Sequence, residues 1–179
     1  MPFSFLGKTL SGCFTVPSGI VTTAPSIIQR VIRDMPEIGV ITTKSIGLEP
    51  RLGNREPVYS QFAPGCFVNA VGLTNPGAQG SLESLGQLCV PDDRFLLVSI
   101  FGGSVEEFVA VAKMLEPVAD GFELNLSCPH ASGYGMAMGQ DPRIVGEIVA
   151  AVKQAVSKPI IPKLTPNVAQ IAEIGQAAL

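Results

Sequence analysis

Strand-length apolar runs alternate with helical patterns along this sequence, and that alternation constrains the fold more than any other feature. It is typical of βα units that build a parallel sheet, so we expect an α/β fold. About five units are present, which leaves two architectures open: a complete doubly wound domain, or part of a (β/α)8 barrel, which normally needs ~250 residues. The expected strands span residues 13–17, 39–43, 95–100, 121–126 and 159–164.

Capping signals predict where the intervening helices begin. Pro25 suits the first turn of a helix. Ser104 with Glu107 forms a capping box, and Asp141 is placed to cap a third helix. The Pro- and Gly-rich stretch 47–65 is predicted to be a long loop. Two further helices are expected, one carrying Leu82, Leu85 and Leu88 and one beginning after Asn167.

The composition excludes several classes of partner. The chain is 46% hydrophobic and 15% charged, which is typical of a compact globular domain. Its net charge of −3 comes without basic blocks, so neither nucleic acid nor an anionic membrane surface is an expected partner. The longest apolar run, 95–101, is only as long as a strand, so no membrane span is expected.

The N-terminus and the cysteines indicate a cytoplasmic protein without a metal site. Gly12 and Pro17 interrupt the apolar N-terminal stretch, where a secretory signal requires an unbroken core. No C-x-x-C pair is present, so neither a zinc site nor a disulfide framework is predicted. In a reducing compartment we expect Cys13, Cys66 and Cys89 to be small buried hydrophobic residues.

Polar residues follow the predicted strands, where reactive groups collect in α/β folds. Lys44 and Lys163 stand at two such ends, and a half-buried lysine is costly unless an anionic or electron-accepting ligand meets it. The alternative is that both side chains extend into solvent. The stretch 69–77 offers two amides and two glycines, which suit recognition of a ring with N–H and C=O groups but are also common in ordinary turns.

Cys128 follows the fourth predicted strand and is the candidate general base, because a thiolate can accept a proton. His130 is close enough in sequence to tune such a site, although a single histidine is often a plain loop residue. The chain has no G-x-S-x-G motif, no P-loop and no G-x-G-x-x-G after its first strand. Serine hydrolase, nucleotide hydrolase and nicotinamide Rossmann chemistry are therefore disfavoured.

Four segments together resemble the class 1 dihydroorotate dehydrogenase family, of the type that passes electrons to NAD. They are residues 43–54, 69–77, 123–129 and 163–168, and they occur in the family's order. The resemblance implies a (β/α)8 TIM barrel of which about the first five βα units are present. Residues 1–179 would then be the N-terminal part of a single FMN-binding domain that lacks strands six to eight, with weak FMN binding and little activity on its own.

The resemblance also implies roles for individual residues. Cys128 would remove the C5 proton of dihydroorotate while hydride passes from C6 to FMN. A small dihydropyrimidine substrate, an FAD and iron–sulfur electron-transfer subunit and an oligomeric state are implied as partners. The expected FMN contacts are Ser18, Gly19, Lys44, Ser45, Asn125 and Lys163, and the expected substrate contacts are Lys44, Asn69, Val71, Gly72, Leu73, Asn125 and His130.

Two alternatives stay open. The segment Ser127 to His130 and the later 139–142 are similar to the flavin domain of dihydropyrimidine dehydrogenase, which would imply reduction of uracil and thymine. A truncated, non-catalytic barrel is the other alternative, because the resemblance covers too few strands to close a barrel.

Overall fold

A parallel sheet forms the centre of the computed structural model, which describes residues 3–19, 21–127 and 136–179. The strands of this sheet lie side by side in the order in which they occur in the sequence, β3-β4-β7-β8-β9, with β5 and β6 outside it. That order lacks the reversal of a doubly wound sheet, so the architecture is the arc of a (β/α) barrel. The strands are β3 (Phe14–Val16), β4 (Ile38–Thr42), β7 (Phe95–Ile100), β8 (Gly121–Asn125) and β9 (Ile160–Lys163).

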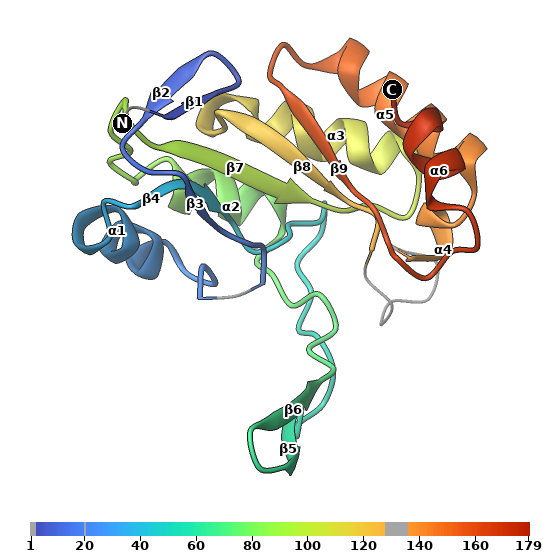
Figure 1. The fold of residues 1–179 in the computed structure, drawn as a ribbon, viewed down its shortest axis with the longest axis horizontal. Helices are drawn as coiled ribbons and strands as arrows, with labels where there is room; N and C mark the ends of the chain where they lie inside the picture. The colour runs from blue at the N-terminus through green and yellow to red at the C-terminus, as the bar shows by residue number, and fades with distance from the viewer. Residues whose placement is uncertain (1–2, 20, 128–135) are drawn as a thin grey trace.

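Helices cover one face of the sheet. Figure 1 shows α2 and α3 behind the strands, and each of α3, α5 and α6 packs beside a helix of the preceding unit. The other face is the inner face of the arc and carries the second, smaller core cluster. The helices are α1 (Pro25–Asp34), α2 (Gly77–Leu85), α3 (Val105–Leu115), α4 (Met136–Gly139), α5 (Pro142–Ala155) and α6 (Ile171–Ala177), with a 3-10 turn at Glu116–Val118.

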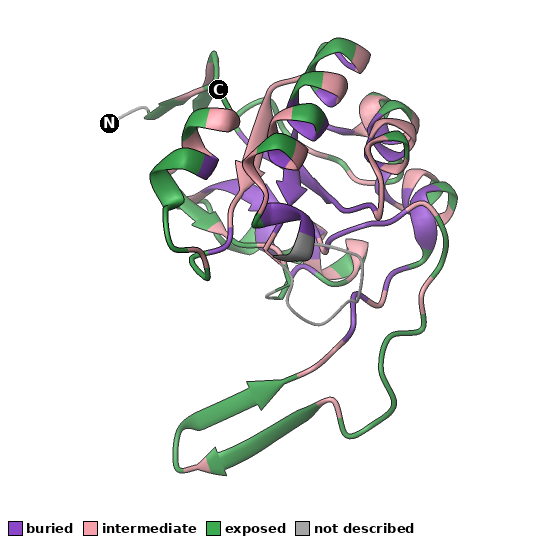
Figure 2. Ribbon diagram, turned by 90° about the vertical axis from the view of Figure 1, so that its right-hand side faces the viewer, coloured by how far each residue is buried: buried purple, intermediate pink, exposed green. Residues whose placement is uncertain are grey.

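Alternation along the strands divides the core between the two faces. In β7, Leu96 and Val98 face the helices, whereas Leu97 lies in a second cluster on the inner face. Phe108 of α3 and Phe122 of β8 are fully buried in the helix-side core, which appears purple in Figure 2. The run 95–100, apolar except for Ser99, correctly predicted a strand that is buried on both faces.

The predicted helix starts are confirmed, with one difference in detail. Pro25 lies in the first turn of α1, and the Asp141 side chain caps α5 by accepting from the Arg143 N–H. Ser104 caps α3 by accepting from the Glu107 N–H at 3.3 Å. The Glu107 carboxylate, however, accepts from the Gly103 N–H at 2.7 Å, one residue before the capping residue.

A short N-terminal hairpin covers part of the inner face and was not predicted. It consists of β1 (Phe3–Phe5) and β2 (Lys8–Leu10). Phe5 meets Phe95 edge-on, with ring centroids 5.2 Å apart, and Leu10 is buried beside it. Strands of three residues are too short to give a clear alternating pattern, which explains the omission.

A second hairpin projects from the body of the protein, joined to it by two extended segments without regular secondary structure (Figures 1 and 2). It pairs β5 (Tyr59–Ala63) with β6 (Cys66–Asn69), and Tyr59 stacks on Phe67. The prediction of a loop over residues 47–65 was therefore wrong for 59–63. Both faces of β5 are largely exposed, so the segment lacks the apolar alternation of a half-buried strand.

The expected burial of three cysteines was wrong. Cys13, Cys66 and Cys89 are all exposed: the first lies beside the edge strand β3, the second on the projecting hairpin and the third in the loop after α2. Within the described residues, no three His, Cys, Asp or Glu side chains gather as metal ligands. None of the helices described here combines the length and apolarity needed to cross a membrane.

Candidate active site

The carboxyl ends of the parallel strands meet at one rim of the sheet. Beyond β4, residues 43–46 continue to hydrogen-bond to β7: the Thr43 N–H donates to Leu97 O, and the Ile46 N–H donates to Ser99 O. Lys44 and Ser45 are thus held on an extension of the sheet rather than on a free loop. Asn125 and Lys163 are paired residues at the ends of β8 and β9.

An ion pair lies on the inner side of this rim. Lys163 Nζ is 2.8 Å from Glu123 Oε1 and also donates to Ser18 Oγ at the end of the first parallel strand. The Glu123 side chain is 10% exposed and that of Lys163 is 33% exposed. Lys163 therefore does not simply extend into solvent, because a buried carboxylate and a hydroxyl hold its ammonium group.

A directed chain of hydrogen bonds connects this pair to Asn125. Ser99 Oγ donates to Glu123 Oε1 at 2.7 Å, and the Ser45 and Ser99 hydroxyls are 2.9 Å apart. Because the single Ser99 proton goes to Glu123, Ser45 must donate to Ser99. Ser45 in turn accepts from Asn125 Nδ2 at 2.8 Å. Every donor in the chain thus points toward the carboxylate.

At the far end of this series of hydrogen bonds, the other edge of the Asn125 amide faces Ser127. Asn125 Oδ1 accepts from the N–H and the Oγ of Ser127, at 3.2 and 3.1 Å. Asn125 and Ser45 are 5% and 4% exposed, so water does not compete freely for these bonds. The orientation of the Asn125 amide is accordingly determined on both sides.

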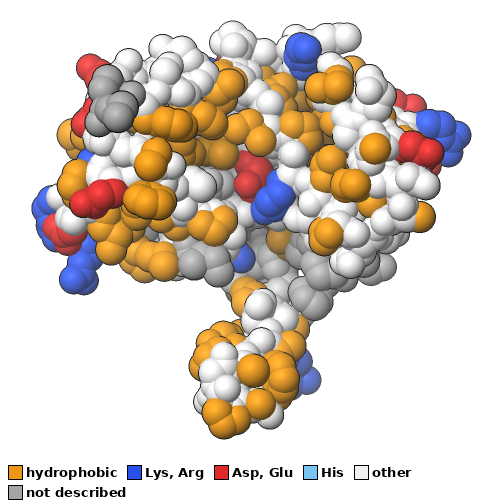
Figure 3. Space-filling view, in the orientation of Figure 1, with side chains coloured by type: hydrophobic (Ala, Val, Ile, Leu, Met, Phe, Trp, Pro, Cys, Tyr) orange, Lys and Arg blue, Asp and Glu red, His pale blue; other side chains and the backbone are white. Residues whose placement is uncertain are grey.

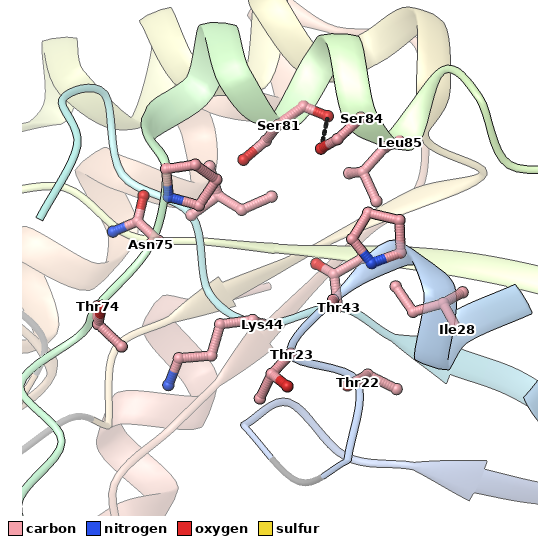
Figure 4. A pocket seen from close by; sticks show the side chains of 14 residues that line it. Thr22, Thr23, Ile28, Thr43, Lys44, Thr74, Asn75, Ser81, Ser84 and Leu85 are labelled. Atoms are coloured by element: carbon pink, nitrogen blue, oxygen red, sulfur yellow. Dashed lines mark hydrogen bonds between the residues drawn. The ribbon is translucent and has the colours of Figure 1, made fainter. Parts of the chain in front are cut away.

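Lys44 and Gly19 lie close together at the same rim. A Cβ built on Gly19 would lie 3.9 Å from Lys44 Nζ, and Gly19 has a φ of +81°. Lys44 also borders a cavity of about 60 Å³ between α1, α2 and the end of β4, and Figure 4 shows its nitrogen on the side away from Ser81 and Ser84. That volume holds water but not a ring, so a ring-shaped ligand does not fit inside this cavity.

A larger hollow of about 300 Å³ lies on the inner face. Figure 3 views this face and shows hydrophobic side chains gathered on it and on the projecting hairpin. Glu123 borders the hollow, together with apolar residues of three parallel strands and of the N-terminal hairpin. The lining residues are Phe3, Phe5, Cys13, Thr15, Pro17, Val40, Thr42, Leu97, Glu123 and Ile161.

Four predicted substrate residues lie where the projecting hairpin joins the body of the protein, and not in the hydrogen-bonded cluster. They are Asn69, Val71, Gly72 and Leu73. Asn69 is exposed at the end of β6, opposite Tyr59. Gly72 is buried with a φ of +80°, and a Cβ there would come within 2.7 Å of Asn54. Val71 O accepts from the Asn54 N–H, and Leu73 is buried. In the described structure these residues help to join the two extended segments of chain that lead to the projecting hairpin.

One amide of the same stretch is committed to the backbone. Asn75 Oδ1 accepts from the Gly77 N–H at 2.9 Å and from the Gly47 N–H at 3.2 Å, while Nδ2 donates to Leu73 O. For Asn75, the turn interpretation of this stretch is therefore the correct one. Cys128 and His130 lie outside the described residues, and their roles stay predictions.

Sequence reasoning missed Glu123 and Ser99. A signal for Glu123 was present: a charged residue inside a buried strand is costly unless a partner neutralises it. Glu123 also stands two residues before Asn125, so both belong to the same face of β8. Ser99 gave no comparable signal, because a serine in a strand carries no charge that demands a partner.

The sequence matches the family model for dihydroorotate dehydrogenase over residues 2–179. The chain belongs to the dihydroorotate dehydrogenase family. Among curated relatives, the catalytic subunit of dihydroorotate dehydrogenase B (NAD(+)) from Pyrococcus horikoshii is 49% identical over 90% of this chain and 52% of its own length. The subunits of the same name from Pyrococcus furiosus and Methanosarcina mazei are 45% and 42% identical. They are matched over 96% and 98% of this chain and 56% of their own lengths.

Family membership agrees with the fold and with the length of the match. A crystal structure of the dihydroorotate dehydrogenase of Eimeria tenella in complex with ferulenol has a TM-score of 0.79, at 17% identity. It is matched over 97% of this chain and 55% of its own. The chain thus spans about half the length of the curated relatives it matches, and its parallel strands correspond to a partial barrel.

Proposed function

We propose that the protein oxidises dihydroorotate to orotate with FMN as its cofactor. The observation that carries the proposal is the hydrogen-bonded cluster of Lys163, Ser45 and Asn125 at one rim, in a chain of this family. These residues come from three strand ends, which is where α/β barrels place their reactive groups.

The donor set of the rim fits a flavin ring. Ammonium, hydroxyl and amide groups from Lys163, Ser18 and Asn125 suit ring nitrogens and carbonyl oxygens. Gly19, which has no side chain, leaves the approach to Lys44 open on that side. When bound, FMN supplies a two-electron acceptor for the hydride that leaves C6 of the substrate.

The remaining steps belong to residues of the protein. Lys44 would pair with the substrate carboxylate, and Asn125 would hold the pyrimidine by its amide. Cys128 would take the C5 proton as a thiolate, so that the C5–H electron pair forms the new C5=C6 double bond. The substrate roles of Asn69, Val71, Gly72, Leu73 and His130 are part of the same proposal.

We also propose that residues 1–179 supply the first βα units of a single FMN-binding barrel. Phe14 on the edge strand β3 is 64% exposed, and the inner hollow is lined mainly by apolar side chains. Further strands would cover both features. Because the relatives are named catalytic subunits, we propose an electron-transfer partner that carries FAD and an iron–sulfur cluster, in an oligomeric assembly.

The deciding experiment compares substrates and a matched pair of lysine variants in the whole protein. Formation of orotate from dihydroorotate is measured beside reduction of uracil, with FMN added. Lys44→Gln should lower kcat/KM for dihydroorotate about 10- to 100-fold, because a charge-assisted hydrogen bond is lost. Lys113→Gln makes the same chemical change on the exposed surface of α3 and should have no effect.

The outcomes separate the alternatives. Turnover of uracil without turnover of dihydroorotate would replace the proposal by a dihydropyrimidine dehydrogenase-like activity. Binding of FMN without turnover of either substrate would favour a non-catalytic barrel. Equal effects of the two lysine variants would remove Lys44 from the site.

A further inference from the structure

The direction of the hydrogen bonds at the rim depends on the charge of one buried residue. Glu123 is 7% exposed, and its Oε1 accepts from both Lys163 and Ser99. A carboxylate has no proton to give, so the hydroxyl that meets it must donate. Ser99 therefore donates to Glu123, Ser45 donates to Ser99, and Ser45 accepts from Asn125 Nδ2.

We propose that Glu123 is a positioning residue of this site: its carboxylate holds the Lys163 ammonium and, through Ser99 and Ser45, holds the Nδ2 edge of the Asn125 amide, while the Ser127 N–H holds the Oδ1 edge. The inference rests on the proposed function for the identity of the ligand at this site. No reacting atom touches Glu123 in this proposal.

The burial of the two serines allows only one direction for these hydrogen bonds. Ser99 is fully buried and Ser45 is 4% exposed, so no solvent is available to replace a reversed or missing bond. In such surroundings hydrogen bonds in a chain polarise one another, and an unmatched donor is costly. A neutral side chain at position 123 would permit both directions of the bond between Ser99 and Ser45, so Asn125 Nδ2 would lose its fixed acceptor while the Ser127 N–H still holds Oδ1.

A purely structural role for Glu123 predicts something different. If Glu123 only joined β8 to β9 through Lys163, a change at Glu123 would leave Asn125 unaffected, and Ser99 would be dispensable. In our proposal, Ser99 is the link between the two ends. Ser99→Ala should therefore disturb Asn125 while the Lys163 ion pair persists.

The test uses side-chain NMR signals of the 179-residue chain without any ligand. The Lys163 ammonium and the Asn125 amide are assigned with Lys163→Arg and Asn125→Ala variants. Glu123→Gln, which keeps shape and removes charge, should shift both sets of signals. Ser99→Ala should shift only those of Asn125. Glu83→Gln, the same change on the exposed surface of α2, should shift neither.

Each outcome decides the proposal. Unchanged Asn125 signals in Ser99→Ala overturn it, and this variant alone decides if Glu123→Gln fails to fold. In the whole protein, Glu123→Gln should also weaken FMN or orotate binding about tenfold or more. A wild-type protein that forms no orotate would overturn the proposed function but leave the NMR result standing.

Discussion

Asn125 Nδ2 donates to Ser45 Oγ at 2.8 Å, although 80 residues separate them and β7 lies between their strands. The two residues come from βα units that are not adjacent in the sheet. Their contact shows that the rim is one connected polar surface and not a row of independent strand ends.

Removal of the Ser45 hydroxyl should destabilise the fold measurably. Ser45→Ala leaves a buried Asn125 N–H and a buried Ser99 hydroxyl with one partner fewer. We expect the free energy of unfolding to fall by about 1–3 kcal/mol in urea denaturation. Ser60→Ala, on the exposed hairpin, is the control and should change it by less than about 0.5 kcal/mol. Equal effects would contradict the burial described here.

Two phenylalanines should differ sharply in their contribution to stability. Phe108 of α3 is fully buried, so Phe108→Ala should cost about 3–5 kcal/mol of unfolding free energy. Phe62 on the projecting hairpin is 70% exposed, and Phe62→Ala should cost little. Urea denaturation of both variants provides the measurement. A large loss in Phe62→Ala would mean that the hairpin packs against something in solution.

The cap of α3 should depend on the Ser104 oxygen. Ser104→Ala removes the acceptor of the Glu107 N–H and should lower the free energy of unfolding by about 1 kcal/mol. Ser104→Asp keeps an acceptor at the same position and should retain most of the stability. Thermal unfolding followed by circular dichroism compares the two, and an equal loss in both would exclude the cap as the cause.

Acid should weaken the start of α5. Hydrogen bonds from the Arg143 side chain and then from its N–H hold the pKa of Asp141 below the ordinary value of an aspartate. The resulting stability is fully present above the unfolded-state pKa of about 3.9 and is lost as the pH falls through the lower folded-state pKa.

Titration of the Asp141 carboxyl carbon by NMR measures that pKa directly. In Asp141→Asn the side chain still caps the helix but does not titrate. The stability of this variant should consequently vary less with pH below 4 than that of the wild type. An identical pH dependence in both proteins would show that other carboxylates dominate.

Replacement by alanine should change the stability of the protein in opposite directions at two glycines. Gly72 has a φ of +80° and no room for a Cβ beside Asn54, so Gly72→Ala should destabilise the base of the projecting hairpin by about 1–2 kcal/mol. Gly175 lies in α6 with open space around it, and Gly175→Ala should stabilise by about 0.5–1 kcal/mol. Denaturation midpoints give both signs.

The features that could be predicted from the sequence are those that depend on local patterns. The β7 run, the Ser104 cap and the gathering of Lys163 with Asn125 at strand ends followed from periodicity and from the geometry of parallel sheets. Glu123 was not predicted, because its partners Ser99 and Lys163 lie 24 and 40 residues away and only the folded sheet brings them together. The exposed cysteines were missed because average burial tendencies do not describe edge strands and hairpins.

The strand order of the sheet repeats the order in which the ribosome makes the strands. From β4 onward, each strand adds to the edge left by its predecessor, and none must be inserted between two that are already paired. Each strand finds its partner already made, although paired residues such as Val40 and Phe95 lie far apart in sequence. A nascent polypeptide can therefore assemble this sheet unit by unit during translation.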